Sequence, residues 1–252
     1  MLQLVRSILF IAITTVFNPI SQAQPELIDV EMQDGSEVEV RIFPADGDTL
    51  LLGFACDAGA GAQEEATASS LAKDGIEVWM PDILSSLMLP KLKSSLDQID
   101  SDSISNLIDL AHKTGKKVYL IATGPKADLL LRGAAKWETT KKKNLNGAVL
   151  MFPRLNNGAP EPGKEPEYKN AVGTTKLPLL LFEGERTPNR WGVNHLAQAL
   201  HAGGSKVYTK LIPDVRGYFF KREDANLPEQ TVTTQLAGLV KASLFYLQRS
   251  SQ

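Results

Sequence analysis

The sequence predicts an α/β fold with a mostly parallel, eight-stranded sheet that begins with an antiparallel hairpin. Short apolar runs alternate with amphipathic stretches along most of the chain, as in parallel strands joined by crossover helices. The turn Gln33-Asp34-Gly35 lies between the first two runs, as in a hairpin. Of the 252 residues, 43% are hydrophobic and 22% are charged, so the chain can bury the core of one medium-sized domain.

Each element is expected from its own local pattern. The first two strands alternate in polarity, as at a sheet edge, and from the third onward a helical stretch separates most successive strands. The expected strands are residues 28–32, 38–43, 49–54, 76–80, 117–122, 148–152, 179–183 and 207–212. The expected helices are residues 63–73, 101–113, 126–137, 193–202 and 229–248.

Two connections have a different composition. Residues 84–98 mix Leu and Met with Ser and Lys, which predicts a loop with a short helix. Residues 153–176 include Pro160, Pro162 and Pro166, too many turn formers for a long helix. We expect a surface excursion there that forms no separate domain.

The first 23 residues have the order of a secretory signal peptide. Arg6 precedes an apolar or small run at 7–17, which Asn18-Pro19 ends, and Ser21-Gln22-Ala23 supplies small residues before a cleavage point. The apolar run has only about half the length that a membrane-spanning helix needs. We therefore expect cleavage after Ala23 and an exported domain over residues 24–252, periplasmic or secreted. An uncleaved anchor is the alternative.

The charge and cysteine content exclude several classes of protein. Lys and Arg number 27 against 29 Asp and Glu, a net charge of −2, so neither nucleic acid nor a membrane surface is an expected partner after cleavage. The single cysteine, Cys56, excludes an intramolecular disulfide and a Cys-rich metal site. The glycines of residues 53–61 lack the spacing of a phosphate or dinucleotide loop. No cofactor and no metal are expected, since Asp57 and Asp82 at two strand ends lack a third ligand.

Five passages follow one another in a particular order. They are residues 50–61, LLLGFACDAGAG; 71–82, LAKDGIEVWMPD; 116–127, KKVYLIATGPKA; 177–188, LPLLLFEGERTP; and 211–219, LIPDVRGYF. In this order they resemble the oxyanion loop, the helix-glycine-strand passage, the nucleophile turn, the acid-bearing strand and the histidine loop of the α/β-hydrolase superfamily, as in dienelactone hydrolases and esterases. The resemblance covers almost all of residues 24–252. It implies an α/β-hydrolase-like three-layer sandwich with no sizeable lid.

The resemblance also implies a catalytic triad, but this chain has other residues at all three positions. Gly124 stands at the nucleophile position of the G-x-S-x-G turn, and Pro125 after it lacks the N–H of the oxyanion hole. Thr187 stands at the acid position. Arg216, which is no base near neutral pH, stands at the histidine position. We expect the fold of the family without its Ser-His-Asp hydrolase activity.

Three side chains are alternative nucleophiles. Cys56 follows the third strand beside Asp57, and Ser85 and Ser86 follow the fourth. No histidine is implied near any of them, because His195 and the other two histidines fall in predicted helices. A small buried residue at Cys56 and turn serines at 85 and 86 are the simpler interpretations.

Cations gather at the predicted carboxyl edge of the sheet. Lys126, Arg154, Arg186 and Arg216 each follow a strand, and ligands of open α/β sheets bind beyond the carboxyl ends of the strands. We predict a cleft there that accepts a carboxylate, a phosphate or an acidic peptide, with the Cys56–Asp57 loop at its rim. Surface salt bridges with acidic neighbours are the alternative.

The favoured function is an exported, catalytically degenerate protein that binds a small molecule or a protein partner. Two alternatives stay open. One is an active esterase or peptidase with a non-standard nucleophile, and the other is a secreted interaction scaffold. Reactivity toward a serine- or thiol-directed probe would favour the first alternative, and a stable co-purifying partner the second.

Overall fold

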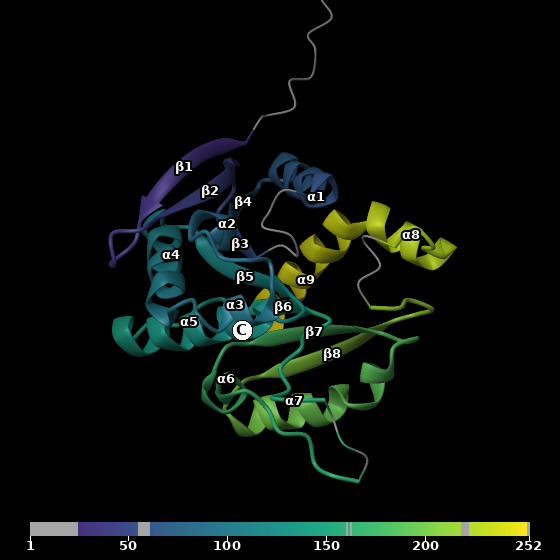
Figure 1. The fold of residues 1–252 in the computed structure, drawn as a ribbon. Coiled ribbons are helices and arrows are strands. Elements are labelled where there is room, and N and C mark those ends of the chain that lie inside the picture. Colours follow the sequence, from purple (N-terminus) through teal and green to yellow (C-terminus); the bar gives the residue numbers. More distant parts are fainter. Residues whose placement is uncertain (1–24, 55–60, 160, 162, 218–221, 251–252) are drawn as a thin grey trace, which may run out of the picture.

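The computed structural model describes residues 25–54, 61–159, 161, 163–217 and 222–250. Its centre is an eight-stranded sheet with the order β1-β2-β4-β3-β5-β6-β7-β8 (Figure 1). The strands are β1 (Glu26–Glu31), β2 (Glu37–Phe43), β3 (Thr49–Phe54), β4 (Ile76–Pro81), β5 (Lys117–Thr123), β6 (Ala148–Met151), β7 (Leu179–Gly184) and β8 (Val207–Ile212). All eight predicted strands are present, with ends within two residues of the prediction.

The pairing confirms the predicted mixture of directions. β1 and β2 form an antiparallel hairpin, and β2 is also antiparallel to β4. From β4 through β3 and β5 to β8, every neighbouring pair is parallel. Among the described strands, β1 and β8 form the two edges of the sheet, each paired with a single neighbour. The carboxyl ends of β5 to β8 therefore lie side by side.

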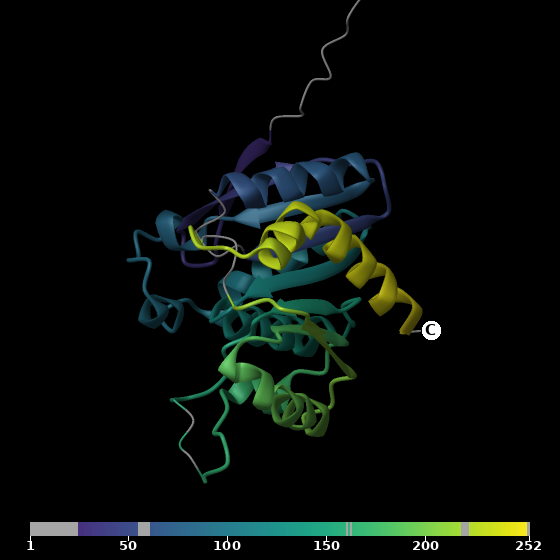
Figure 2. The same ribbon diagram turned by 90° about the vertical axis from the view of Figure 1, so that its right-hand side faces the viewer.

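Helices cover both faces of the sheet and complete three layers. The main helices are α1 (Ala62–Lys73), α4 (Ser101–Lys113), α5 (Lys126–Lys141), α7 (Val193–Ala202), α8 (Leu227–Thr234) and α9 (Leu236–Ser250). α1 and α9 pack side by side on one face, as Figures 1 and 2 both show, and α4, α5 and α7 cover the other. Successive leucines of β3 alternate between the two cores: Leu50 and Leu52 face α4 and α5, while Leu51 faces α1. Burial on both faces explains why this strand is continuously apolar.

The two atypical connections contain only short helices. Residues 84–98 include the end of α2 (Ile83–Ser86) and α3 (Lys93–Leu96), and residues 153–176 include α6 (Asn170–Thr174). A short 3-10 helix, η1 (Pro188–Trp191), follows β7. None of the helices within the described residues is long and apolar enough to cross a membrane.

The prediction of one helix over residues 229–248 is wrong, because the structure has α8 and α9 with a break at Gln235. The hydroxyls of Thr231 and Thr233 bond to carbonyls four residues earlier, which disfavours a straight continuation of a helix. α8 also begins two residues earlier than predicted. Asn226 and Glu229 form a reciprocal capping box there, so the signal for the earlier start was present in the sequence.

Candidate functional site

The chain turns sharply from β5 into α5 at Gly124. Gly124 has φ +60°, a left-handed conformation that glycine adopts at little cost. Its N–H donates to the carbonyl of Met151 at 2.9 Å, and its carbonyl accepts the N–H of Arg154 at 3.0 Å. Pro125, the N-cap of α5, has no N–H. Backbone contacts with β6 and its loop hold the turn, and its apex carries no side chain.

Thr187, predicted at the acid position, lies buried after β7. Its hydroxyl donates to Oε1 of Glu183 at 3.1 Å, and the same oxygen accepts the N–H of Gly184 at 3.0 Å. Glu183 is 2% exposed, and this burial raises the pKa of its carboxyl above the ordinary value. The loop after β7 therefore offers a hydroxyl bound to a buried carboxyl group of the preceding strand.

Arg216, predicted at the histidine position, is turned toward α8. Its Nε and Nη2 donate to the two carboxylate oxygens of Glu229 at 2.8 and 2.7 Å, and its backbone N–H donates to Oε1 at 2.8 Å. Its Nη1 donates to Oδ2 of Asp224 at 2.9 Å. Glu229 is completely buried, and the Arg216 hydrogen bonds hold its pKa at about 2. The same contacts raise the pKa of Arg216 further above its ordinary value, so the guanidinium cannot accept a proton.

The loops after β7 and β8 are fastened to each other. The N–H groups of Glu185 and Arg186 donate to the carbonyls of Ile212 and Val215, both at 3.0 Å. A Cβ at Gly184 would lie 2.3 Å from the carbonyl oxygen of Val215, so only glycine permits this approach. The close contact fixes Arg186 and Arg216 beside each other at the carboxyl edge.

A pocket of about 380 Å³ opens at this edge, beyond β6, β7 and β8. Four arginines are among the described residues that line it, together with one acidic residue, Glu183. Its lining residues are Phe152, Arg154, Glu183, Arg186, Thr187, Pro188, Asn189, Arg216, Gly217 and Arg222. Phe152 was predicted to extend the sixth strand, but its φ of +50° ends β6 at Met151 and starts the loop that carries Arg154. The site is thus built from three separate loops.

The predicted ligand-binding residues fall into three groups. Arg154, Arg186 and Arg216 line the pocket together. Lys126 begins α5 and is 7% exposed, but it is not among the described lining residues. Cys56 and Asp57 lie outside the described residues.

Arg222 also lines the pocket, although no sequence motif marks it. It follows Arg216 by six residues, and the two share the carboxylate of Asp224, at 3.1 and 2.9 Å respectively. A second cation in the loop that carries Arg216 was the one available signal. Asp224 therefore places two of the four arginines at the pocket.

The two alternative serine nucleophiles lie after β4, and neither is among the described residues of this pocket. Asp82 caps α2 by accepting the N–H of Ser85 at 3.2 Å, and the Ser86 hydroxyl accepts the N–H of Glu39 at 3.0 Å. The first contact caps the helix locally, and the second joins α2 to β2. Within the described part of the chain, no group of three or more His, Cys, Asp or Glu side chains is arranged to hold a metal ion.

The three histidines make contacts of other kinds. His112 packs edge-on against Trp137 at 5.1 Å between ring centroids. His195 Nδ1 and the Tyr168 hydroxyl lie 2.9 Å apart, and His201 Nδ1 lies 3.1 Å from the carbonyl of Ser205. No histidine is among the residues described as lining the arginine pocket.

Comparison with known proteins identifies the fold. No family model matches the sequence, and no curated protein matches it. A protein described as a dienelactone hydrolase from Klebsiella pneumoniae subsp. pneumoniae has a TM-score of 0.61 at 13% identity, over 84% of this chain and 95% of that chain. Thermogutta terrifontis esterase 2 has a TM-score of 0.58 at 17% identity, over 90% and 94%.

An esterase from Pyrobaculum calidifontis has a TM-score of 0.58 at 16% identity, over 88% of this chain and 85% of that chain. Identities this low carry no activity or ligand across to this chain. The eight-stranded, mostly parallel sheet, its antiparallel hairpin at one end and this structural likeness confirm the predicted architecture. The chain therefore has the α/β-hydrolase fold.

Proposed function

We propose that this protein uses the α/β-hydrolase fold to bind an anionic ligand without hydrolysing it. The observation that carries the proposal is the gathering of Arg154, Arg186, Arg216 and Arg222 around one pocket. A guanidinium group presents N–H donors in a plane and pairs readily with two oxygens of a carboxylate or phosphate. The carboxyl ends of parallel strands are also where ligands of this fold class bind.

The turn after β5 supports the non-hydrolytic part of the proposal. Gly124 has no atom that could attack a carbonyl carbon, and Pro125 cannot donate an N–H to an oxyanion. The guanidinium of Arg216 cannot take up a proton. A triad reaction needs all three functions, and these residues supply none of them.

Arg186 is the arginine best placed to meet the ligand. Its side chain is exposed at the pocket, and among the described residues it makes no hydrogen bond or ion pair. Arg216 and Arg222, in contrast, are tied to Asp224. We expect Arg186 to make the principal contact with the ligand. Arg216 should contribute mainly through its positive electrostatic field and its fixed position at the pocket.

Calorimetric titration tests the proposal, with inorganic phosphate and succinate as the two probes. We expect saturable binding of at least one of them, weakened at least tenfold by Arg186→Ala. Arg249→Ala is the matched control, because Arg249 lies on α9 against the Phe245 ring. Absence of saturable binding for both anions, or equal affinity of the Arg186→Ala and unaltered proteins, would reject the anion site.

Covalent labelling tests the non-hydrolytic part separately. A fluorophosphonate probe and a thiol-directed probe are applied to the full protein alongside an ester hydrolysis assay. We expect no adduct with the fluorophosphonate and no hydrolysis above the buffer rate. Turnover accompanied by an adduct on a serine or on Cys56 would instead establish the alternative, a hydrolase with a non-standard nucleophile.

We also propose that the protein is exported after removal of residues 1–23. The charged, apolar and small-residue order of that segment supports this location. Expression of the full chain in a Gram-negative bacterium tests it, through fractionation and intact mass. We expect a periplasmic protein that begins at Gln24, and a full-length chain retained in the cytoplasm or membrane would contradict the proposal.

A further inference from the structure

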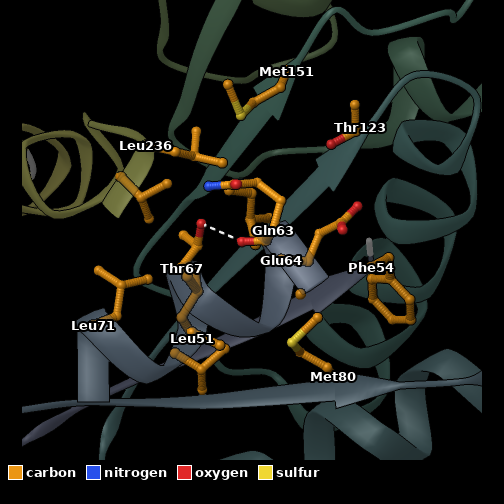
Figure 3. Close-up of a pocket in the computed structure, with 15 residues that line it drawn as sticks. Leu51, Phe54, Gln63, Glu64, Thr67, Leu71, Met80, Thr123, Met151 and Leu236 are labelled. Carbon is orange, nitrogen blue, oxygen red and sulfur yellow. Dashed lines mark hydrogen bonds between the residues drawn. The ribbon is translucent and has the colours of Figure 1, made fainter. Parts of the chain in front are cut away.

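A second, smaller pocket lies on the face of the sheet that α1 and α9 cover. It has a volume of about 80 Å³ and takes its walls from α1, α9 and the strands β3 to β6 (Figure 3). Most of its lining is apolar. The apolar side chains that line it include Leu51, Leu71, Ile121, Met151, Leu236 and Val240.

A glycine inside a strand helps to create this space. Gly53 lies within β3, where glycine weakens a strand and often marks a close approach by another group. A Cβ at Gly53 would lie 3.0 Å from Cγ2 of Ile121, so any larger residue would enter the pocket. Ile121 and Thr123 stay only half-buried although β5 has a strand on each side. The open space beside them explains this exposure.

The pocket has one polar side. Figure 3 shows Thr123 and Glu64 on the side opposite Leu71. Within the described part of the chain, the Thr123 hydroxyl makes no hydrogen bond. Gln63 and Thr67 are already engaged: Gln63 Nε2 donates to the carbonyl of Thr233 at 3.1 Å, and Thr67 Oγ1 donates to the carbonyl of Gln63 at 2.8 Å. Thr123 and Glu64 are therefore the polar groups that a ligand would meet.

We propose that this pocket binds a short unbranched aliphatic chain with a neutral hydroxyl head, as in a primary alcohol of about two to four carbons. An empty apolar cavity of about 150 Å³ accommodates benzene, so about 80 Å³ accommodates roughly half as many carbon atoms. A hydroxyl can donate to Glu64 and accept from Thr123. A carboxylate head would be repelled by Glu64. This site shares no described lining residue with the arginine pocket, so it does not depend on anion binding there.

Methyl NMR of the full protein tests the inference with ethanol, 1-propanol, 1-butanol and 1-pentanol as probes. We expect saturable shifts confined to methyl groups at the pocket, among them those of Leu51, Ile121 and Met151. Affinity should rise roughly fourfold per added methylene until the pocket is full. Butyrate should bind at least tenfold more weakly than 1-butanol. Non-saturating shifts, or equal binding of butyrate and 1-butanol, would overturn the proposal.

Two variants that fill the pocket make the test specific. Gly53→Ala adds a carbon next to Ile121, and Thr67→Leu adds bulk from the half-buried face of α1. Each should weaken alcohol binding at least tenfold, and Thr67→Leu carries the test if Gly53→Ala does not fold. Gly173→Ala is the matched control, because a Cβ there meets no atom within 4 Å. Unchanged alcohol binding in a folded filled variant would reject this pocket as the site.

Discussion

The carboxylate of Glu229 connects the loop after β8 to the start of α8. Both of its oxygens accept hydrogen bonds from Arg216, and Oε2 also accepts the N–H of Asn226 at 3.0 Å. The carboxylate is completely buried, so each of these donors replaces water that it has lost. Arg216 therefore has a structural role in addition to its place at the pocket.

The buried pair of Glu229 and Arg216 makes the stability of the fold decrease as the pH is lowered. A carboxyl group whose pKa falls from 4.5 to about 2 on folding stabilises the fold above pH 4.5, and this contribution is lost as the pH falls toward 2. We expect Glu229→Gln to lower Tm by roughly 5 °C at pH 7. The difference from the unaltered protein should shrink between pH 4.5 and 2.

Thermal unfolding at pH 7, 4 and 2.5 measures this trend. Glu223→Gln is the control, because Glu223 is exposed and lies in the same loop region. A Glu229→Gln effect that stays constant across the three pH values would show that the Arg216 contact does not govern the titration of Glu229.

Introducing a serine at the turn apex should not produce ester hydrolysis. Gly124→Ser would place a hydroxyl at φ +60°, at a cost of about 1–2 kcal/mol for a left-handed side-chain-bearing residue. Pro125 and Arg216 would still provide neither an oxyanion donor nor a base. We expect a lower Tm and no ester hydrolysis above that of Gly124→Ala. Turnover specific to the serine variant would show that another group acts as the base.

Among the elements, α4 and α5 make a close helix contact that depends on Gly133. A Cβ at Gly133 would lie 2.3 Å from Cγ2 of Ile104, which is itself completely buried. We expect Gly133→Ala to destabilise the protein by about 1–3 kcal/mol, the usual cost of overpacking a core. Thermal unfolding measures this cost. A Gly133→Ala variant as stable as the unaltered protein would contradict this dependence.

The elements also show where sequence patterns are sufficient. Two of the strands match their predicted bounds, at residues 49–54 and 207–212. Each is a short run of mainly apolar or β-branched residues, bounded by turn or polar residues. The break at Gln235 was not anticipated, because the apolar spacing runs through it and only the threonine contacts before it interrupt the helix. The spacing of apolar residues predicts which face of a helix is buried. It does not show where side-chain hydrogen bonds compete with the hydrogen bonds of the helix backbone.

At the scale of the whole molecule, strand order decides how much of the site is predictable. Arg154, Arg186 and Arg216 could be expected together, since each follows a strand of one parallel series. Arg222 could not, because its position depends on the shared carboxylate of Asp224. The apolar pocket could not be predicted either. Its walls come from six elements, and no single segment of the sequence shows how they pack together. Ligand binding at either pocket stays a prediction.

The small net charge gives the anion site a characteristic salt dependence. A net charge of −2 provides no long-range attraction for anions, so binding must come from the local arginines. Screening then acts mainly on this short-range field. We expect phosphate affinity to fall about tenfold between 20 and 500 mM sodium chloride and less in Arg186→Ala, as measured by titration calorimetry. An affinity that does not change with salt would contradict an arginine-based site.

The two borders of the sheet carry charges of opposite sign. β1 bears Glu26, Asp29 and Glu31, whereas Lys210 lies in β8 and Lys206 immediately before it. If two molecules paired β1 with β1, or β8 with β8, side chains of like charge would come together. This repulsion opposes a continuous sheet formed by two molecules about a twofold axis. The chain thus has a built-in electrostatic barrier against symmetrical self-association along its backbone.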